Sequence, residues 1–361
     1  MFTKLTEKLD SFLDMHLPWY DCIVYHKGKC VYRHANGFLD LEKTMPVKGD
    51  EHYNIFSCSK VITCIAALMI YEKGLYNLND KLSDYLPEFK EMYVKQEDGS
   101  LKKAENEITI KHLFTMTAGF SYDLCSPSMK LFKEETKELG TTREFCKYLA
   151  KEPLLFEPGE KYNYSLCHDV LAAVMEVITG IEFNQFCTEN IFKPLGMNNT
   201  TYLLPEKDYE KVAPIYCYRA NEEKLDIPAS KIPAYRLTLN HASGGAGCTS
   251  TVEDYIKFLE GVRTYKLIKK ETIDLMTTNH LTKKQLSFFP LGESGYGYGL
   301  GVRCPLNGST KTDFGWGGAA GAHLAIDIEN EITIFYAQHV TSSLVQAVRA
   351  QITPIIQEIL K

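Results

Sequence analysis

The chain has 361 residues, 45% of them apolar, so it can bury a sizeable core as one large domain or two, and disordered and collagen-like classes are excluded. Lys and Arg number 40 against 46 Asp and Glu, which gives a formal net charge of -6, and no run of Lys or Arg interrupts the mixture. Because such a balance repels a phosphate backbone, we expect no nucleic-acid partner.

The cysteines and the apolar runs bear on compartment and cofactors. Eleven cysteines form an odd set without a C-x-x-C pair or the His spacing of a zinc site, which favours free thiols in a reducing cytosol and predicts no metal or other cofactor. The first residues open an amphipathic helix rather than an export signal. The longest apolar stretch, residues 61–71, is about half of the roughly 20 residues that a bilayer crossing needs. We therefore predict a cytoplasmic protein without a membrane partner.

Helical and strand patterns alternate in the first part of the chain. Residues 5–17 carry apolar side chains at helical spacing. Two β-prone runs, residues 21–26 and 29–33, flank a Lys-Gly turn and predict a hairpin. Residues 61–73 are continuously apolar and stop before Gly74, which suits a left-handed C-terminal cap. A buried helix is expected there.

The middle of the chain is predicted to be helical, and strands return late. Residues 87–108 mix charges of both signs with little apolar content, which is typical of a solvated surface segment. Their role as a lid stays open at this point. The remaining predicted elements are helices at 130–139, 142–151 and 169–179, strands at 296–302, 323–327 and 331–338, and a closing helix at 344–360 that is interrupted at Pro354.

This order of elements predicts an α+β fold. The early and late strands must share one antiparallel sheet if neither set is to keep bare edges, and helices at both ends of the chain flank it. We predict a discontinuous sheet domain from residues 1–86 and 235–361, with residues 87–234 inserted as a mostly helical domain. The active site is expected in the cleft between the two.

Most familiar catalytic signatures are missing. H-E-x-x-H is absent, and the nearest approach to G-x-S-x-G, at residues 119–123, lacks its last glycine. One candidate remains, because Ser57 falls on the first turn of the buried helix and Lys60 one turn later on the same face. Backbone N–H groups at a helix start favour a developing oxyanion, and a lysine in an apolar wall is pushed toward the neutral form that accepts a serine proton.

Spacing alone does not decide this assignment. Ser100 and Lys103 have the same spacing within the charged segment, where nothing would desolvate the lysine. Ser57 is also a suitable N-cap residue, with Lys60 extending to solvent. The residue pattern by itself leaves both interpretations open.

Longer stretches of sequence resemble a known superfamily. From about residue 20 to 340 the chain resembles the serine β-lactamase and penicillin-binding-protein-like superfamily, most closely class C β-lactamases and family VIII carboxylesterases. The Ser/Lys motif is a known signature of that group. The matching blocks are YNIFSCSK at 53–60, the run at 71–87, IKHLFTMTAG at 110–119, FEPG at 156–159, YS at 164–165, PLGM at 194–197, SGGAG at 243–247 and GWGGAAG at 315–321.

The resemblance implies a role for particular residues. Ser57 would be the acylated nucleophile and Lys60 its partner. Tyr164 falls where the superfamily has the tyrosine of its Y-x-N element, which shares a proton with the lysine and serves the leaving group. The backbone N–H groups of Ser57 and Ala319 would form the oxyanion hole.

Departures from the superfamily pattern point to the substrate. Leu166 stands where Y-x-N has its Asn, and Trp316, followed by Gly317 and Gly318, stands where the K-T-G strand has its Lys. We expect these four residues to contact the substrate. Loss of the charge partner and the amide would cost about 2 to 5 kcal/mol together, which removes most β-lactam turnover.

These inferences predict a serine hydrolase that works through an acyl-enzyme on Ser57. A carboxylesterase acting on small or apolar acyl esters is the first choice. The alternatives are a β-lactamase, a D-amino-acid amidase or peptidase, or an acyl transferase on the same scaffold, and beyond these a catalytically idle scaffold or binding protein. A small-molecule ester or amide is the predicted partner, and the sequence leaves the oligomeric state open.

Overall fold

A seven-stranded sheet joins the first and last parts of the chain in the computed structural model, which describes residues 1–227 and 230–361. Every neighbouring pair in it is antiparallel, in the order β2-β1-β13-β12-β11-β10-β9. Its strands are β1 (Trp19–His26), β2 (Lys29–Gly37), β9 (Tyr296–Tyr298), β10 (Arg303–Pro305), β11 (Phe314–Gly317), β12 (His323–Asp327) and β13 (Ile332–Ala337).

The junction between early and late strands lies between β1 and β13, where Asp21 is paired with Ala337 and His26 with Ile332. β1 and β13 are buried along almost their whole length, since helices cover both faces of the sheet at this point. The predicted sharing of one sheet by the two ends of the chain is therefore confirmed. The predicted hairpin turn is present as well, with a positive φ at Gly28 that suits glycine.

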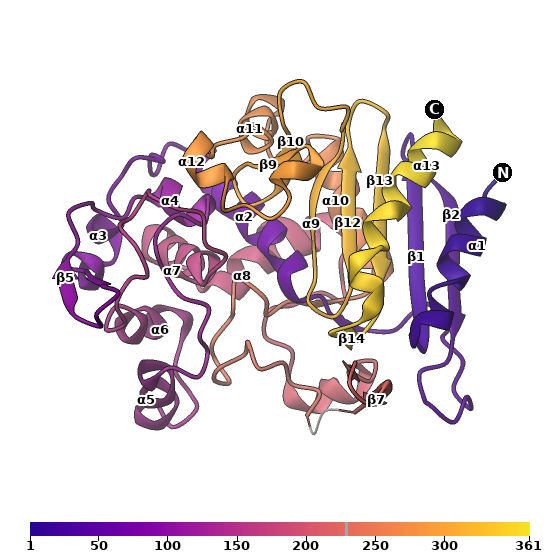
Figure 1. The fold of residues 1–361 in the computed structure, drawn as a ribbon, viewed down its shortest axis with the longest axis horizontal. Coiled ribbons are helices and arrows are strands. Elements are labelled where there is room, and N and C mark those ends of the chain that lie inside the picture. The colour runs from indigo at the N-terminus through magenta and orange to yellow at the C-terminus, as the bar shows by residue number, and fades with distance from the viewer. Residues whose placement is uncertain (228–229) are drawn as a thin grey trace.

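Helices pack on both faces of this sheet (Figure 1). α1 (Thr3–Asp10) and α13 (Ile352–Leu360) lie side by side on one face, and α10 (Val252–Arg263) covers the other against β1 and β13. The prediction of a sheet flanked by terminal helices is confirmed. The closing helix, however, breaks at Val348 and not at Pro354, because Pro354 lies in the first turn of α13, where a backbone N–H is not needed.

Most of the other helices lie to the left of the sheet in Figure 1. α2 (Ser59–Glu72) runs through the centre of the molecule, is buried on all sides and packs against α7 (Cys167–Thr179). The division into a sheet domain (residues 1–86 and 235–361) and a helical domain (residues 87–234) stays a prediction. The remaining helices are α3 (Leu82–Tyr85), α4 (Ile110–Phe114), α5 (Pro127–Glu135), α6 (Thr142–Leu149), α8 (Phe183–Cys187), α9 (Lys193–Leu195), α11 (Lys270–Met276) and α12 (Lys283–Leu286).

Three small sheets complete the structure. They pair β3 (Tyr53–Asn54) with β8 (Thr249–Ser250), β4 (Tyr93–Lys95) with β5 (Leu101–Lys103), and β6 (Tyr216–Arg219) with both β7 (Lys224–Asp226) and β14 (Val340–Thr341). The charged segment 87–108 thus contains a short hairpin. It is mostly exposed, as predicted. None of its residues lines the cavity described below.

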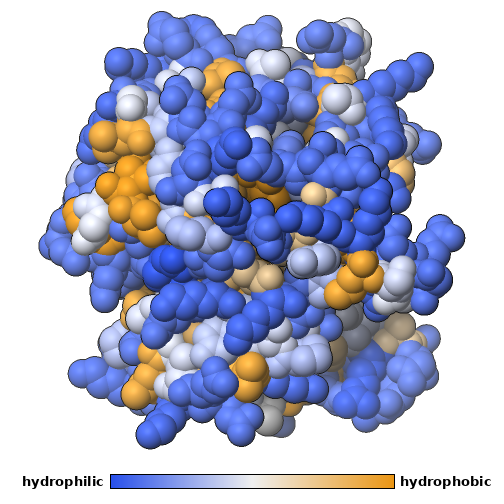
Figure 2. All heavy atoms as spheres, turned by 90° about the vertical axis from the view of Figure 1, so that its left-hand side faces the viewer, coloured by the Kyte–Doolittle hydropathy of each residue, from blue (hydrophilic) through white to orange (hydrophobic). Residues whose placement is uncertain are grey.

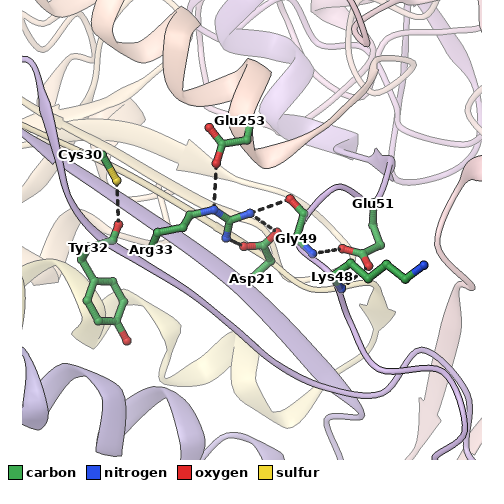
Figure 3. A network of polar contacts seen from close by, with 8 residues as sticks. All are labelled: Asp21, Cys30, Tyr32, Arg33, Lys48, Gly49, Glu51 and Glu253. Carbon is green, nitrogen blue, oxygen red and sulfur yellow. Dashed lines mark hydrogen bonds and ion pairs between the residues drawn. The ribbon is translucent and has the colours of Figure 1, made fainter.

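An ion-pair cluster ties the loop before β3 to the main sheet (Figure 3). The guanidinium of Arg33 on β2 donates to the buried carboxylate of Asp21 on β1, to Glu253 on α10 at 2.9 Å, and to the carbonyl of Gly49 at 2.7 Å. The carboxylate of Glu51 accepts from the Gly49 N–H at 2.8 Å. Because this loop runs directly into β3 and the turn that follows, the cluster fixes the path of the chain toward Ser57.

The surface of the helical side is largely hydrophilic, with small separate apolar patches (Figure 2). Among the described residues no single helix has the length and apolar content of a bilayer span. α7 and the segment Phe183–Leu195 pass the length and composition test only together, and they are bent by 82° relative to one another.

Candidate active site

Ser57 lies in a 3-10 turn, Phe56–Cys58, directly before α2. The expectation that it occupies the first turn of the α-helix is therefore corrected by two residues, and Lys60 is the second residue of α2. Phe56 has a φ of 47°, a left-handed conformation that costs a bulky residue about 1 to 3 kcal/mol. Its ring is held against Tyr235 and Ala320. This strained residue tightens the turn and presents the Ser57 hydroxyl to the cavity.

Lys60 is fully buried and does not extend to solvent. Its Nζ donates to the carbonyl of Gly245 at 2.7 Å, to the hydroxyl of Tyr122 at 3.2 Å and to Ser57 Oγ at 3.4 Å. An ammonium group has three N–H donors, so these three acceptors match its full donor capacity. The interpretation of Ser57 and Lys60 as an N-cap and a solvent-exposed lysine does not fit this geometry.

Tyr164 is the third residue at the site. Its hydroxyl and Ser57 Oγ share a hydrogen bond of 2.6 Å, the shortest contact of the serine. The Tyr164 ring stacks with Tyr122, at 5.4 Å between centroids, and with Trp316, at 5.7 Å. Lys60 Nζ lies 4.5 Å from the centre of the ring, and the Trp316 indole N–H donates to the Tyr164 oxygen at 3.2 Å. The Lys60 Nζ therefore faces the Tyr164 ring, and the Trp316 N–H faces the Tyr164 oxygen.

Tyr122 is a site residue that the sequence analysis does not identify. It lies in the loop after α4, hydrogen-bonded to Lys60 and stacked on Tyr164. Burial, together with the charges of Tyr164 and Asp169, raises the pKa of Tyr122 well above its ordinary value, so its phenol stays protonated. With 22 tyrosines in the chain, no spacing or composition signal distinguishes this one.

The end of β11 faces the nucleophile. The Ala319 N–H has no hydrogen-bond acceptor among the described residues, and Ala319 lines the cavity beside Ser57. The carbonyls on either side of it are held from the C-terminal segment: Arg349 donates to Gly318 O at 2.9 Å, and Gln346 donates to Ala319 O at 2.6 Å. These bonds orient the free N–H of Ala319, as an oxyanion hole requires.

Gly317 and Gly318 serve this close approach. A Cβ on Gly318 would lie 2.6 Å from the carbonyl oxygen of Ile55, and one on Gly317 would lie 2.6 Å from an Arg349 nitrogen. Only glycine allows β11 to come so near to the loop that carries Ser57. The structure thus brings together Ser57, Lys60, Tyr164, Trp316, Gly317, Gly318 and Ala319, seven of the eight predicted site residues.

The eighth predicted residue, Leu166, lies elsewhere. It directly precedes α7, is buried in the hydrophobic core, and does not line the cavity. Its side chain packs inward because the chain turns into α7 at this point. The expectation that Leu166 contacts substrate is therefore corrected.

Cys58 and His168 lie close to the site without joining its hydrogen bonds. Burial raises the pKa of the Cys58 thiol to about 12 and lowers that of His168 to about 3, so both are uncharged near neutral pH. His168 is completely buried against Cys64, although its place at a helix start predicts exposure. Neither residue is suited to act as nucleophile or base.

Ser57 opens into a cavity of about 620 Å³, within the usual range for small-molecule sites. Its wall is largely aromatic and includes Tyr162, Tyr235, Phe289 and Trp316. Four polar or charged residues also line it: Arg303, His323, Gln346 and Arg349. Among the described residues no group of three or more His, Cys, Asp or Glu side chains is placed to hold a metal ion.

Comparison with known proteins agrees with this geometry. The sequence model of the family described as Beta-lactamase matches residues 21–352. The chain belongs to the Beta-lactamase family. The superfamily resemblance, the β-lactamase-like fold and the prediction of a serine hydrolase enzyme are thereby confirmed.

Individual relatives include esterases and acyl-transferring enzymes. The sequence is 29% identical to Esterase EstB of Burkholderia gladioli over 293 residues, which covers 75% of this chain and 73% of the relative. The fold is similar to EstCE1, described as a hydrolase with promiscuous acyltransferase activity, with a TM-score of 0.79, 24% identity and 98% of both chains covered. It is also similar to a mutant simvastatin synthase of Aspergillus terreus, with a TM-score of 0.81, 20% identity and coverage of 100% and 98%.

Proposed function

We propose that this protein is a carboxylesterase that forms an acyl-enzyme on Ser57 and acts on small or apolar acyl esters. The observation that carries the proposal is the position of Trp316, whose ring forms part of the cavity wall and stacks on Tyr164 beside the nucleophile. An apolar wall at this place favours an uncharged, apolar substrate group. The name of one relative, Esterase EstB, supports the same choice.

In the proposed reaction Tyr164 removes the proton from Ser57. The residue pattern alone predicts a neutral Lys60 as the base, but the 2.6 Å contact of Tyr164 and the 3.4 Å contact of Lys60 with Ser57 Oγ support Tyr164. Lys60 as an ammonium, 4.5 Å from the Tyr164 ring, and the Trp316 N–H both stabilise negative charge on the tyrosine oxygen.

Acyl transfer then follows from the same contacts. Ser57 Oγ attacks the ester carbonyl carbon, and the N–H groups of Ser57 and Ala319 stabilise the resulting oxyanion. When the carbon–oxygen bond to the alcohol breaks, Tyr164 returns its proton to the departing alcohol oxygen. Water, deprotonated in turn by Tyr164, attacks the acyl carbon. When the bond between that carbon and Ser57 Oγ breaks, Tyr164 gives the proton to Ser57 Oγ, which releases the acid and restores both residues.

Amide hydrolysis of a carboxylate-bearing substrate is the second candidate, and Arg349 is the observation in its favour. Its guanidinium lines the cavity, donates to Gly318 O, and forms no ion pair within the described residues. Such a cation suits the carboxylate of a β-lactam or a D-amino-acid amide. Arg349 would then supply the positive charge that Trp316 does not provide.

The test compares the purified protein with Ser57→Ala on p-nitrophenyl acetate, p-nitrophenyl butyrate and nitrocefin. We expect ester turnover by the wild type, at least about a thousandfold less by the variant, and an acyl mass shift on Ser57 in the wild type. Equal ester rates from both proteins would disprove the Ser57 assignment. Faster turnover of nitrocefin than of either ester would favour the second candidate.

A further inference from the structure

A second charged group is buried behind Lys60. Asp169, in the first turn of α7, has 1% of its surface exposed. Its Oδ1 accepts a hydrogen bond from Ser243 Oγ at 2.5 Å, whereas Oδ2 has no hydrogen-bond partner among the described residues. A buried carboxylate oxygen without a donor is costly unless an opposite charge lies nearby.

Lys60 provides that charge across Gly245. A Cβ on Gly245 would lie 2.5 Å from Asp169 Oδ2 and 3.3 Å from Lys60 Nζ, so both atoms surround one point. They are therefore within about 6 Å of each other, the range in which opposite charges stabilise one another strongly in an interior. Gly245 acts as a thin spacer, because any larger residue would collide with the carboxylate.

Asp169 is also linked mechanically to the lysine. Ser243, which donates to Asp169, accepts from the N–H of Ala246 at 3.1 Å and begins the tight turn of residues 243–247. That turn presents the carbonyl of Gly245, the nearest acceptor of Lys60 Nζ at 2.7 Å. The carboxylate thus fixes both the charge behind Lys60 and the carbonyl on which it rests.

The thiols around this pair carry no compensating charge near neutral pH. Cys58 lies in the turn directly before α2, Cys64 lies within α2, and Cys167 lies in α7. Burial raises the pKa of Cys58 and of Cys167 to about 12 and that of Cys64 well above its ordinary value. All three thiols are therefore protonated.

The rings around the pair are uncharged as well. Burial raises the pKa values of Tyr122 and Tyr235, and it lowers that of His168 to about 3 and that of His241 to about 4. Tyr164, the proposed base, is the remaining ring that faces Lys60. Among the described residues, Asp169 is the carboxylate that lies beside Lys60.

We propose that Asp169 is a positioning residue of the active site: its carboxylate is the counter-charge of Lys60 and, through Ser243, holds the Gly245 carbonyl that accepts a hydrogen bond from Lys60. This inference rests on the proposed role of Ser57, Lys60 and Tyr164 in acyl transfer. Its new content is the charge pair across a glycine, in which the lysine keeps its N–H donors for the two hydroxyls and the carbonyl instead of giving them to the carboxylate.

The first experiment separates charge from shape by pH profiles of kcat/KM on p-nitrophenyl butyrate. Asp169→Asn keeps the size of the side chain and an acceptor for Ser243 but removes the negative charge beside Lys60, so loss of a proton from the active site becomes easier. We expect the acidic limb of the profile to move down by about one pH unit. Ser243→Ala keeps the charge and should lower kcat without moving the limb. An Asp169→Asn profile that coincides with the wild-type limb would overturn the proposal.

The second experiment needs no enzymatic activity, so it tests the charge pair even if the proposed esterase function is wrong. Asp169→Asn is made in the wild type and in Lys60→Met, and thermal unfolding midpoints are measured. In the wild type the substitution should lower the midpoint, since it leaves Lys60 uncompensated; in Lys60→Met it should raise the midpoint, since the carboxylate there has no partner. Equal changes in both backgrounds would disprove the coupling.

The cycle remains informative if Asp169→Asn alone does not fold. The double variant Lys60→Met with Asp169→Asn, which has neither charge, should then fold and unfold cooperatively. Failure of the double variant as well would show that Asp169 is required for the fold independently of Lys60, which contradicts the proposal.

Discussion

Two regions of the molecule bury a positive charge, and they do so in different ways. In the sheet, Arg303 donates directly to Asp313 at 2.7 Å, and Tyr296 donates to the same carboxylate at 2.7 Å. At the active site, Lys60 donates to neutral oxygens and lies over aromatic rings, with Asp169 one glycine away. The first arrangement uses the cation to hold elements together, whereas the second leaves its donors for groups that exchange protons.

The comparison predicts where each region will be sensitive. Breaking the direct pair in the sheet leaves an unpaired buried charge and should reduce stability. Removing an oxygen partner of Lys60 leaves the core packing intact and should reduce the rate. Three sets of variants examine this contrast, beginning with the largest expected effect.

The largest effect is expected when the two tyrosines that contact Lys60 are each replaced by phenylalanine in separate variants. Tyr164→Phe keeps the stacking with Tyr122 and Trp316 but removes the oxygen bonded to Ser57, so kcat/KM should fall by about 10² to 10⁴ with little change in unfolding midpoint. Tyr122→Phe is the matched control: it removes the phenol oxygen that accepts from Lys60 at 3.2 Å and should cost less than about tenfold. Equal losses from the two variants would contradict the assignment of Tyr164 as base.

The sheet side of the comparison is tested by Asp313→Asn. Arg303 loses its buried ion-pair partner, so denaturant unfolding should show a loss of about 3 to 5 kcal/mol. Lys4→Met is the control, because it breaks the exposed pair with Glu358 between α1 and α13 and should change stability little. Equal losses of stability from Asp313→Asn and Lys4→Met would contradict the assignment of the Arg303–Asp313 pair as a structural contact.

The smallest effect concerns Glu176, at the other end of the helix that carries Asp169. Burial raises its pKa to about 7 from an ordinary value of 4.5. Between these values the folded state binds a proton that the unfolded chain releases, so the stability it provides falls as the pH rises toward 7. Glu176→Gln should therefore stabilise the protein by about 1 to 2 kcal/mol at pH 8.5 and leave it unchanged at pH 4.

Urea unfolding at the two pH values measures this effect. The exposed neighbour Glu182 supplies the control, since Glu182→Gln should show no pH-dependent gain. A gain from Glu176→Gln of the same size at both pH values would mean that the buried carboxyl does not titrate as described.

Much of the fold follows from local patterns in the sequence. The hairpin of β1 and β2, the continuously apolar α2 ending at Gly74, and the helix α7 ending at Gly180 each carry their own signal. The sheet that joins both ends of the chain follows from the need to pair strand edges. β10 (Arg303–Pro305) was not predictable in this way, because three residues ending in proline show no alternation.

The site is only partly predictable. Ser57 and Lys60 stand out by their place at the start of a continuously apolar helix, and Tyr164 and Ala319 by resemblance to a known superfamily. Tyr122, Asp169 and Arg349 come from three distant segments, and nothing in these sequences indicates that they meet. The backbone of Phe56 could not be predicted either. Its side chain does not favour a positive φ, and tertiary packing imposes that conformation.

The adjacency of β1 and β13 has a consequence for biosynthesis. β1 is synthesised before the helical part of the chain, whereas β13, which pairs with its free edge, follows that part. During translation the backbone donors and acceptors along this edge of β1 therefore stay unpaired, a state that favours aggregation. Truncation before residue 332 would leave this edge of β1 unpaired permanently. We therefore expect the chain to depend on chaperones during synthesis.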